Sequence, residues 1–360
     1  MTLPWPSLLL LLWPAAVQTP DRVHLMDATT VSGQVTAATL DAVSVTGASG
    51  EQKIEARQVF RIEFADKPEA LRNAESFLQA HDYQNAVNSF ESADGAVGPW
   101  WVQPVARLGR ADALLAWSRI DKSRAGEAAD AYAQWLSAYP NSFFEPRARL
   151  GQARALSLAG KTEDASRLLE ELATTAFQRN LGKHVELGAR LERALAYLAG
   201  GQAQVAEARL NDLVPEIGQV LSAGPPKALV APLRQLLAQA EIALGEAKVA
   251  RNGDAAARPY WEGLLADRSA GPDTRGAATI GLALAARSEG KHREAQLLLA
   301  RVVATLPGGS ETLARALYEL GDVSRELGNS PVASALYFQQ VVAEFPSSPW
   351  AAKARVELGG

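Results

Sequence analysis

The residues that could support catalysis are few and scattered along the chain. Gly160-Lys161-Thr162 resembles the end of a phosphate-binding loop, in which the lysine and the hydroxyl contact nucleotide phosphates and magnesium. Such a loop also needs a glycine five residues earlier, where Ala155 stands, and a strand before it, which the pattern does not predict. We therefore expect these residues to form a turn between helices rather than a nucleotide site.

The sequence contains no recognisable arrangement of residues for metal, acid–base or nucleophilic chemistry. The chain has no cysteine, which excludes thiolate metal sites, cysteine nucleophiles and disulfides. No Gly-x-Ser-x-Gly motif is present, and neighbouring carboxylates such as Glu170-Glu171 point to different parts of a helix surface. The histidines are scattered, with no pair at the spacing of a metal-binding motif: His24, His81, His184 and His292. We expect a protein without enzymatic activity, cofactor or metal.

The N-terminal residues resemble an export signal. A short apolar run, Leu8 to Trp13, is followed by the small residues Ala15 and Ala16. The run is too short for an ordinary membrane-spanning helix, which takes about 20 apolar residues, and it suits a signal-peptide core. We predict that residues 1–18 are a signal peptide and that the protein is exported to the periplasm or cell envelope. An uncleaved N-terminal anchor is the alternative, because no Lys or Arg precedes the run.

Residues 21–66 alternate between apolar and polar side chains, as in half-buried strands. Val23 and Leu25, Val43 and Val45, and Phe60 to Phe64 illustrate the period of two, with Gly and Asp breakers between the runs. Five short strands in this length predict a small barrel of SH3-like or Sm-like type. It would serve either as a packing module at the head of the helices or as a recognition module.

From residue 68 to residue 360 the spacing is helical, and alanine, leucine and arginine dominate. One frame recurs: a small residue, a glycine seven residues later, an alanine five after that, and a large apolar residue four further on. The glycine ends the first helix of a pair, and the apolar residue shares a face with the alanine. The alanines of this frame are Ala86, Ala128, Ala165, Ala206, Ala257, Ala295 and Ala333, and its clearest glycines are Gly160, Gly290 and Gly328.

This frame resembles the tetratricopeptide repeat, a pair of antiparallel helices. The resemblance implies a mainly α-helical, right-handed solenoid of about seven helical pairs, with a capping helix near residues 351–358. The alanines are 42, 37, 41, 51, 38 and 38 residues apart, which is longer than the family's repeat and least regular in the middle. A solenoid of generic helical pairs is the alternative.

The family binds partners in the concave groove that the first helices line. The positions that correspond to groove contacts include Arg110, Trp117, Arg147, Leu150, Arg154, Arg287, Arg315, Tyr318, Asp322 and Arg325. Because arginine binds carboxylates through two hydrogen bonds, we hypothesise that the groove takes acidic segments. The alternative is that these arginines are solvated or pair with nearby Asp and Glu. A second candidate patch, Trp100-Trp101, is equally compatible with burial between the first two pairs.

Composition allows a sizeable core and gives no indication of nucleic-acid binding. With 48% hydrophobic residues and a net charge of −4, the chain can build a core and carries no basic footprint for nucleic acid. The resemblance to periplasmic repeat proteins implies a protein-interaction scaffold of the bacterial cell envelope, reaching membranes only through its partners. The alternative is a ligand- or peptide-binding accessory protein whose β module is the recognition head, which requires an apolar pocket in the barrel.

Overall fold

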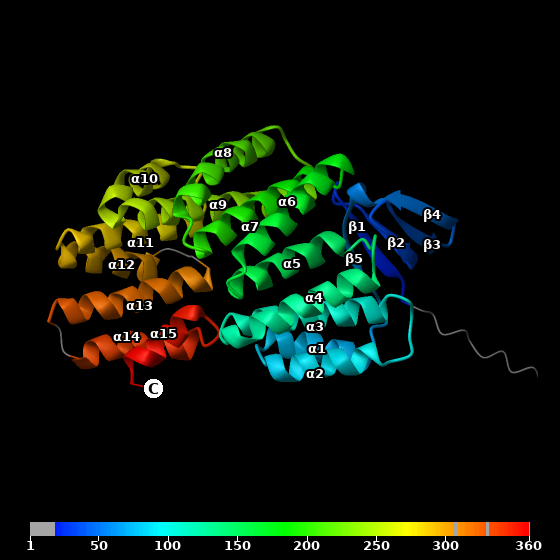
Figure 1. Ribbon diagram of the computed structural model, residues 1–360, viewed down its shortest axis with the longest axis horizontal. Helices are drawn as coiled ribbons and strands as arrows, with labels where there is room; N and C mark the ends of the chain where they lie inside the picture. Colours follow the sequence, from blue (N-terminus) through cyan, green and yellow to red (C-terminus); the bar gives the residue numbers. More distant parts are fainter. Residues whose placement is uncertain (1–18, 306–308, 329–330, 360) are drawn as a thin grey trace, which may run out of the picture.

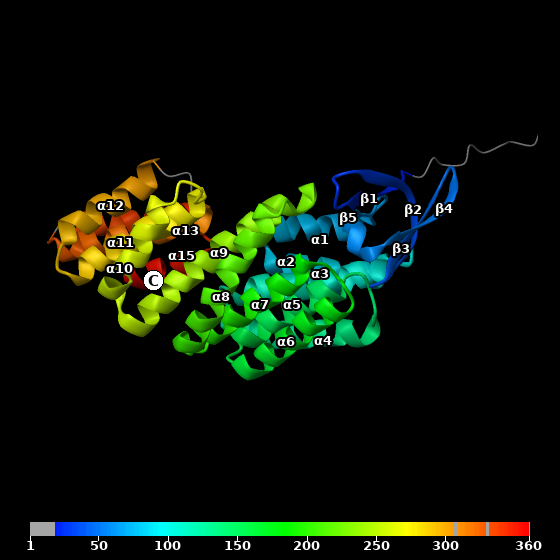
Figure 2. The ribbon, with the colours of Figure 1, turned by 90° about the horizontal axis from the view of Figure 1, so that it is seen from above.

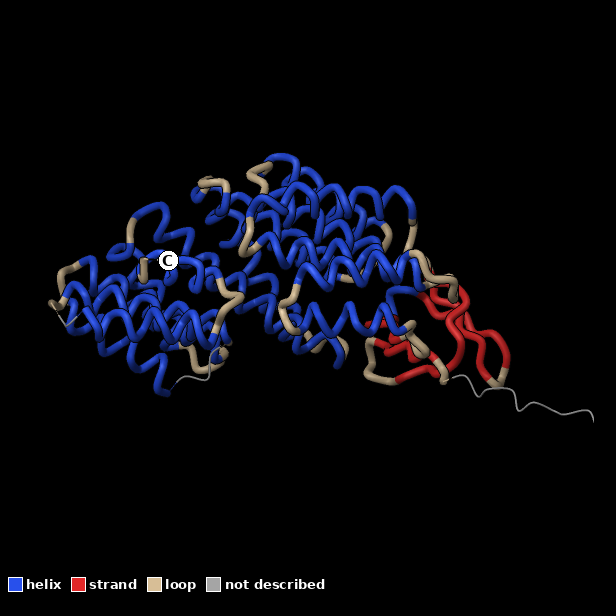
Figure 3. Tube along the Cα trace, turned by 90° about the horizontal axis from the view of Figure 1, so that it is seen from below, coloured by secondary structure: helices blue, strands red, loops and turns tan. Residues whose placement is uncertain are grey.

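The computed structural model describes residues 19–305, 309–328 and 331–359; the predicted signal peptide, residues 1–18, lies outside these ranges. Within them, a five-stranded sheet is followed by fifteen α-helices. The strands gather at one end of an elongated molecule and the C-terminal helices lie at the other (Figures 1 and 3). The prediction of a mainly helical chain with a small antiparallel sheet is confirmed. No helix in the described ranges combines the length and hydrophobicity needed to cross a bilayer.

The sheet is open, so the prediction of a barrel is wrong. Its strands are β1 (Asp21–Leu25), β2 (Thr30–Ala38), β3 (Ala42–Gly47), β4 (Gly50–Glu55) and β5 (Val59–Glu63). They pair antiparallel in the order β4-β3-β2-β1-β5, and β4 and β5 do not join to close the sheet. The inward side chains Val23, Val43 and Val45 are fully buried and belong to the same core as the first helices. A neighbouring helical layer therefore covers the apolar face that closure would have buried.

The helices form seven successive pairs and a final single helix. The pairs are α1 (Glu69–Gln79) and α2 (Tyr83–Asp94); α3 (Val102–Ser118) and α4 (Ala125–Ala138); α5 (Glu145–Leu158) and α6 (Thr162–Gln178); α7 (Lys183–Ala199) and α8 (Ala203–Ser222); α9 (Lys227–Asn252) and α10 (Asp254–Ala266); α11 (Pro272–Ser288) and α12 (His292–Thr305); and α13 (Ser310–Glu326) and α14 (Pro331–Glu344). The last helix is α15 (Pro349–Glu357). The irregular middle spacing is absorbed by α8, of 20 residues, and α9, of 26 residues.

The turn inside several pairs is the same left-handed cap. Gly160, Gly201 and Gly290 have φ values of +76°, +75° and +77°. The next residue in each case donates its N–H to a carbonyl five residues earlier, for example Lys161 to Leu156 at 2.9 Å. His81 occupies the same place in the first pair with φ +59°. This bond pattern is a Schellman motif, which satisfies the last carbonyls of the first helix before the chain reverses.

The array curves with the first helix of each pair on its inner side. Each first helix contacts the next one, in the series α1, α3, α5, α7, α9, α11, α13 and α15, whereas no two second helices in the described ranges pack as closely. Shorter separation on one side of a stack bends the stack toward that side. The resulting arc is visible in Figure 1, and Figure 2 shows α9 running through its middle.

Aromatic side chains of the second helices pack onto glycines of the first helices. Phe90 lies against Gly109, and Tyr132 lies against Gly151. Trp261 lies against both Gly245 and Gly281, the glycines of its own pair and of the next. The absence of a Cβ lets a large ring lie against the helix backbone, so the pairs stack closely at these points.

The predicted alanines occupy the buried face of each second helix, with one exception. Ala86, Ala165 and Ala295 are fully buried, as are Ala128 and Ala206, and Ala257 is 1% exposed. In α14, however, Ala333 is half-buried, and Ser334 and Phe338 take the buried places. Phe338 lies against Gly321 of α13. The frame of the last pair is therefore shifted by one residue relative to the prediction.

The sheet is fastened to the helices at separate points. Trp101 is stacked on Phe64 at 4.4 Å between ring centroids, and Trp100 donates its indole N–H to the carbonyl of Val35 at 2.9 Å. Farther along the chain, the start of α9 reaches the turn after β1, where the Ala228 N–H donates to the Met26 carbonyl. These contacts hold the sheet against the helical array at one end of the molecule (Figure 1).

Candidate functional site

Most of the arginines predicted to bind a partner are occupied by carboxylates of this chain. Arg110 pairs with Glu91 at 2.8 Å, Arg147 pairs with Asp112, and Arg154 pairs with Glu192. The alternative interpretation, that these arginines pair with nearby Asp and Glu, therefore describes the structure. Their guanidinium groups are therefore not unpaired cations along the groove.

The C-terminal positions form a second internal network. Arg287 of α11 contacts Glu319 and Glu326 of α13, at 3.1 and 2.5 Å, and Arg325 of α13 contacts Glu357 of α15 at 2.6 Å. Burial raises the pKa of Glu319 above its usual range. Tyr318 packs on the rings of Phe338 and Trp350, each at 5.4 Å, and Arg315 lies over the Trp350 ring. These side chains link α11, α13 and α15 to one another.

The aromatic candidates are also engaged inside the fold. Trp101 is 4% exposed, so it belongs to the junction of sheet and helices rather than to a binding patch. Trp100 is 44% exposed, yet its indole N–H is bonded within the junction. Trp117 is half-buried and covered by the Arg124 guanidinium, 4.3 Å from its ring centroid.

The inner side of the arc contains a groove, called here the inner groove, built by four consecutive first helices. It encloses about 710 Å³. Its lining comes from α3 and the residue after it (Leu115, Arg119); from α5 (Ala153, Arg154, Ser157, Leu158); from α6 (Leu169); from α7 (Glu192, Leu195, Ala196, Ala199); and from α9 (Gln235, Gln239, Ile242, Ala243, Glu246). Of the predicted contact residues, Arg154 is part of this lining. The floor is made of small and branched apolar side chains.

The polar groups of the inner groove differ in their partners, and Arg119 forms no ion pair with any residue that the structure describes. Arg154 and Glu246 are neutralised by Glu192 and by Arg315 of α13, the latter at 2.9 Å. By contrast, the amides of Gln235 and Gln239 form no hydrogen bond with any residue that the structure describes. They lie one helical turn apart on α9, so both face the groove. An amide both donates and accepts, which suits the backbone of a bound segment.

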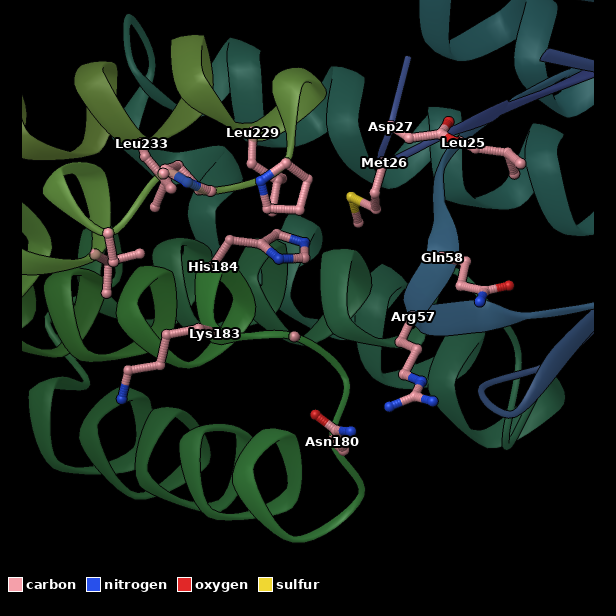
Figure 4. A pocket seen from close by; sticks show the side chains of 16 residues that line it. Leu25, Met26, Asp27, Arg57, Gln58, Asn180, Lys183, His184, Leu229 and Leu233 are labelled. Atoms are coloured by element: carbon pink, nitrogen blue, oxygen red, sulfur yellow. The ribbon is translucent and has the colours of Figure 1, made fainter. Parts of the chain in front are cut away.

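A second cavity, called the junction cavity, lies where the sheet meets the start of α9. It encloses about 750 Å³ and its apolar lining includes Met26, Leu229 and Leu233 (Figure 4). The His184 ring points into it, while the Nδ1 of that ring is enclosed and has no hydrogen-bond partner in the described ranges. Burial lowers the pKa of His184. The lowered pKa favours the neutral form of this imidazole, which lies beside the apolar side chains of the lining.

A third, smaller cavity of about 280 Å³ adjoins the junction cavity and shares Met26, Arg57 and His184 with it. Arg147, predicted to face the concave groove, lines this cavity instead. The ranges that the structure describes contain no cluster of three or more metal-ligating side chains.

Sequence reasoning missed Gln235, Gln239 and His184 as lining residues. The two glutamines lie on α9, where the sequence matches the repeat pattern least well, so the pattern could not predict which side of the helix faces the groove. One signal was available for the ion pairs: Arg154 and Glu192 are 38 residues apart, as are the last three alanines of the frame from one to the next. Charges of opposite sign one repeat apart on first helices meet across the inner layer.

No protein-family model matches the chain, and no curated protein matches its sequence. Among the solved structures that resemble its fold are two of one protein. The first is NprR in complex with its cognate peptide NprX, with 14% identity, 81% of this chain and 82% of that chain covered, and a TM-score of 0.46. The second is the apo form of the quorum sensor NprR from B. thuringiensis, with 15% identity, coverage of 80% and 79%, and a TM-score of 0.47. Both are distant likenesses in helical arrangement.

Proposed function

We propose that the chain is a non-enzymatic scaffold of the bacterial cell envelope that holds segments of partner proteins in the inner groove. The observation that carries the proposal is the groove itself: an apolar floor from four first helices beside two glutamine amides that have no partner among the described residues. Apolar clefts with a few convergent polar groups are the usual form of binding sites.

The groove favours a peptide segment over a charged small molecule. Leu195 and Ile242 are half-buried, and Leu158 is 37% exposed, so a partner's apolar side chains would remove further apolar surface from water. Gln235 and Gln239 would hydrogen-bond the backbone of the segment. Because Arg154, Glu192 and Glu246 are already paired, Arg119 is the lining charge left for a partner, and shape and apolar contact contribute most of the recognition.

Photo-cross-linking tests the site. A photoreactive phenylalanine analogue at Gln239 in the inner groove is compared with the same analogue at Leu297, which is 61% exposed on the second helix α12. We expect a discrete protein adduct from position 239 and none of that mass from position 297. The adduct should disappear when Leu195→Glu places a charge in the apolar floor. An adduct that forms equally from both positions, or that survives Leu195→Glu, would contradict the proposal.

The cell-envelope assignment is tested separately, through the N-terminus. We expect the protein in the periplasmic fraction to begin after Ala16 or Gln18 when it is sequenced from its N-terminus. A protein found only in the cytoplasm with its first eighteen residues intact would refute the location, and it would leave the inner groove to be judged by the cross-links.

The alternative function, with the β module as recognition head, requires an apolar pocket inside a barrel. The open sheet encloses no such pocket among the described residues, so we do not propose that alternative in its original form.

A further inference from the structure

Strand β5 presents a free edge. It pairs with β1 on one side, and no strand in the described ranges pairs with it on the other. The Met26 N–H donates to the Gln58 carbonyl, just before β5, whereas the Leu25 N–H donates to the Thr29 carbonyl, just before β2. Because backbone groups alternate sides along a strand, the N–H and C=O of His24 point toward its partner Arg61 in β5. The N–H and C=O of Ile62, the next residue of β5, therefore point away from β1, toward the free edge.

The third cavity described above, of about 280 Å³, runs along this edge. We call it the edge groove. Four consecutive residues of β5 line it: Val59, Phe60, Arg61 and Ile62. Successive side chains of a strand point to opposite faces, so a cavity that touches all four lies beside the strand rather than on one face. The opposite wall consists of Phe143, Phe144, Pro146, Leu181 and Val185, from the segment before α5 and from the starts of α5 and α7.

The charged side chains that line the edge groove are arginines. Among its lining residues are Arg57, Arg61 and Arg147, and no lining residue is acidic. Each pairs with a carboxylate of this chain, of Glu55, Glu63 and Asp112 respectively, yet their side chains remain 52%, 61% and 64% exposed, so a partner's carboxylate can still reach them. The other edge strand, β4, has the polar sequence GEQKIE and lines none of the cavities described above. Charge, apolar lining and free backbone groups thus coincide at β5 alone.

We propose that β5 accepts an extended segment of another protein as a sixth strand of the sheet, running between β5 and the starts of α5 and α7. Backbone hydrogen bonds to Ile62 supply affinity, alternate apolar side chains enter the edge groove, and acidic side chains face the three arginines. This site is separate from the inner groove and does not depend on the function proposed for it.

The probe is a library of random decapeptides displayed on phage and selected on the purified full-length exported protein. We expect selected peptides to alternate apolar and acidic residues. Arg61→Glu should weaken their binding about tenfold or more, because it replaces an attractive charge with a repulsive one. Lys53→Glu, the same charge change on the other edge strand, should leave binding within about twofold of the parent value.

A second measurement reports on the backbone. Peptide addition should slow amide hydrogen exchange at Ile62. Two methylated forms of the peptide are compared, one N-methylated at its odd-numbered amides and one at its even-numbered amides. Only the form whose methylated amides face β5 should lose binding. Several results would overturn the proposal: no enriched peptide, unchanged exchange at Ile62, or equal binding of both methylated forms. So would peptides that bind Arg61→Glu as well as the parent but fail to bind Leu195→Glu, since they occupy the inner groove. Concentration-dependent dimers without peptide would assign β5 to a second copy of this chain.

Discussion

At the scale of single residues, arginine in this protein mainly joins one helix to another. Arg193 of α7 pairs with Glu170 of α6 at 2.8 Å, and Arg154 of α5 pairs with Glu192 of α7. In each pair one side chain is largely buried, Arg193 at 15% and Glu192 at 12% exposed, and the other is in contact with solvent. Their value lies in fixing how successive helices are oriented, because a guanidinium and a carboxylate meet in one preferred geometry.

His184 offers a test of burial at the residue scale. Its native pKa is lowered by burial, so the unfolded chain binds the proton more readily than the folded chain does. Stability from this residue is complete above its ordinary pKa of about 6.5 and falls as the pH drops below that value. We expect the free energy of unfolding to fall by up to about 1.4 kcal/mol for each pH unit below about 6.5, until the native pKa is reached.

Urea unfolding at pH 7.5 and 5.0 measures this effect. The parent protein should lose more stability between these values than His184→Gln or His184→Leu, because neither variant titrates there. Parallel losses in the parent and both variants would show that the imidazole is not responsible.

At the scale of elements, contacts of aromatic rings with glycine set the distance between neighbouring pairs. Trp261 of α10 is 3% exposed and lies between Gly245 of α9 and Gly281 of α11. The ring therefore touches its own pair and the following one, and it belongs to a core cluster with Ala278 and Leu282. Close packing leaves no room for an added methyl group at these glycines.

Gly281→Ala should destabilise the protein by about 1–3 kcal/mol, because the new Cβ would overlap the Trp261 ring. Gly263→Ala is the matched control on α10, where a Cβ would meet nothing within 4 Å. That variant should gain up to about 1 kcal/mol from helix propensity. Chemical unfolding midpoints measure both changes. Equal stabilisation by the two substitutions would mean that the contact with Trp261 does not limit packing.

At the scale of the whole molecule, α15 closes the last pair. Ala351 and Ala354 are fully buried against Phe338 and Val341 of α14, in one cluster with Leu317 of α13. Arg325 of α13 also reaches Glu357 of α15. A stacked array exposes the apolar face of its last unit unless a terminal element covers it.

Removal of residues 349–360 should lower the melting temperature and cause self-association, because the rings of Phe338 and Tyr318 would become exposed. Thermal unfolding and light scattering after size-exclusion chromatography measure the two effects. Removal of residues 358–360 alone is the control and should change neither. A shortened chain that stays monomeric and melts with the parent would show that α15 is not a cap.

The sequence by itself determined the local structure: alternation predicted strands in residues 21–66, and the recurring glycine and alanine predicted helical pairs after residue 68. These features depend on neighbours a few residues away, so the chain pattern records them. Tertiary structure decided the rest. The sheet stays open because α1 to α5 share its core, Trp101 is buried because Phe64 meets it, and the arginines are paired because carboxylates lie on adjacent helices. Such outcomes depend on contacts between residues distant in the chain, which no local pattern specifies.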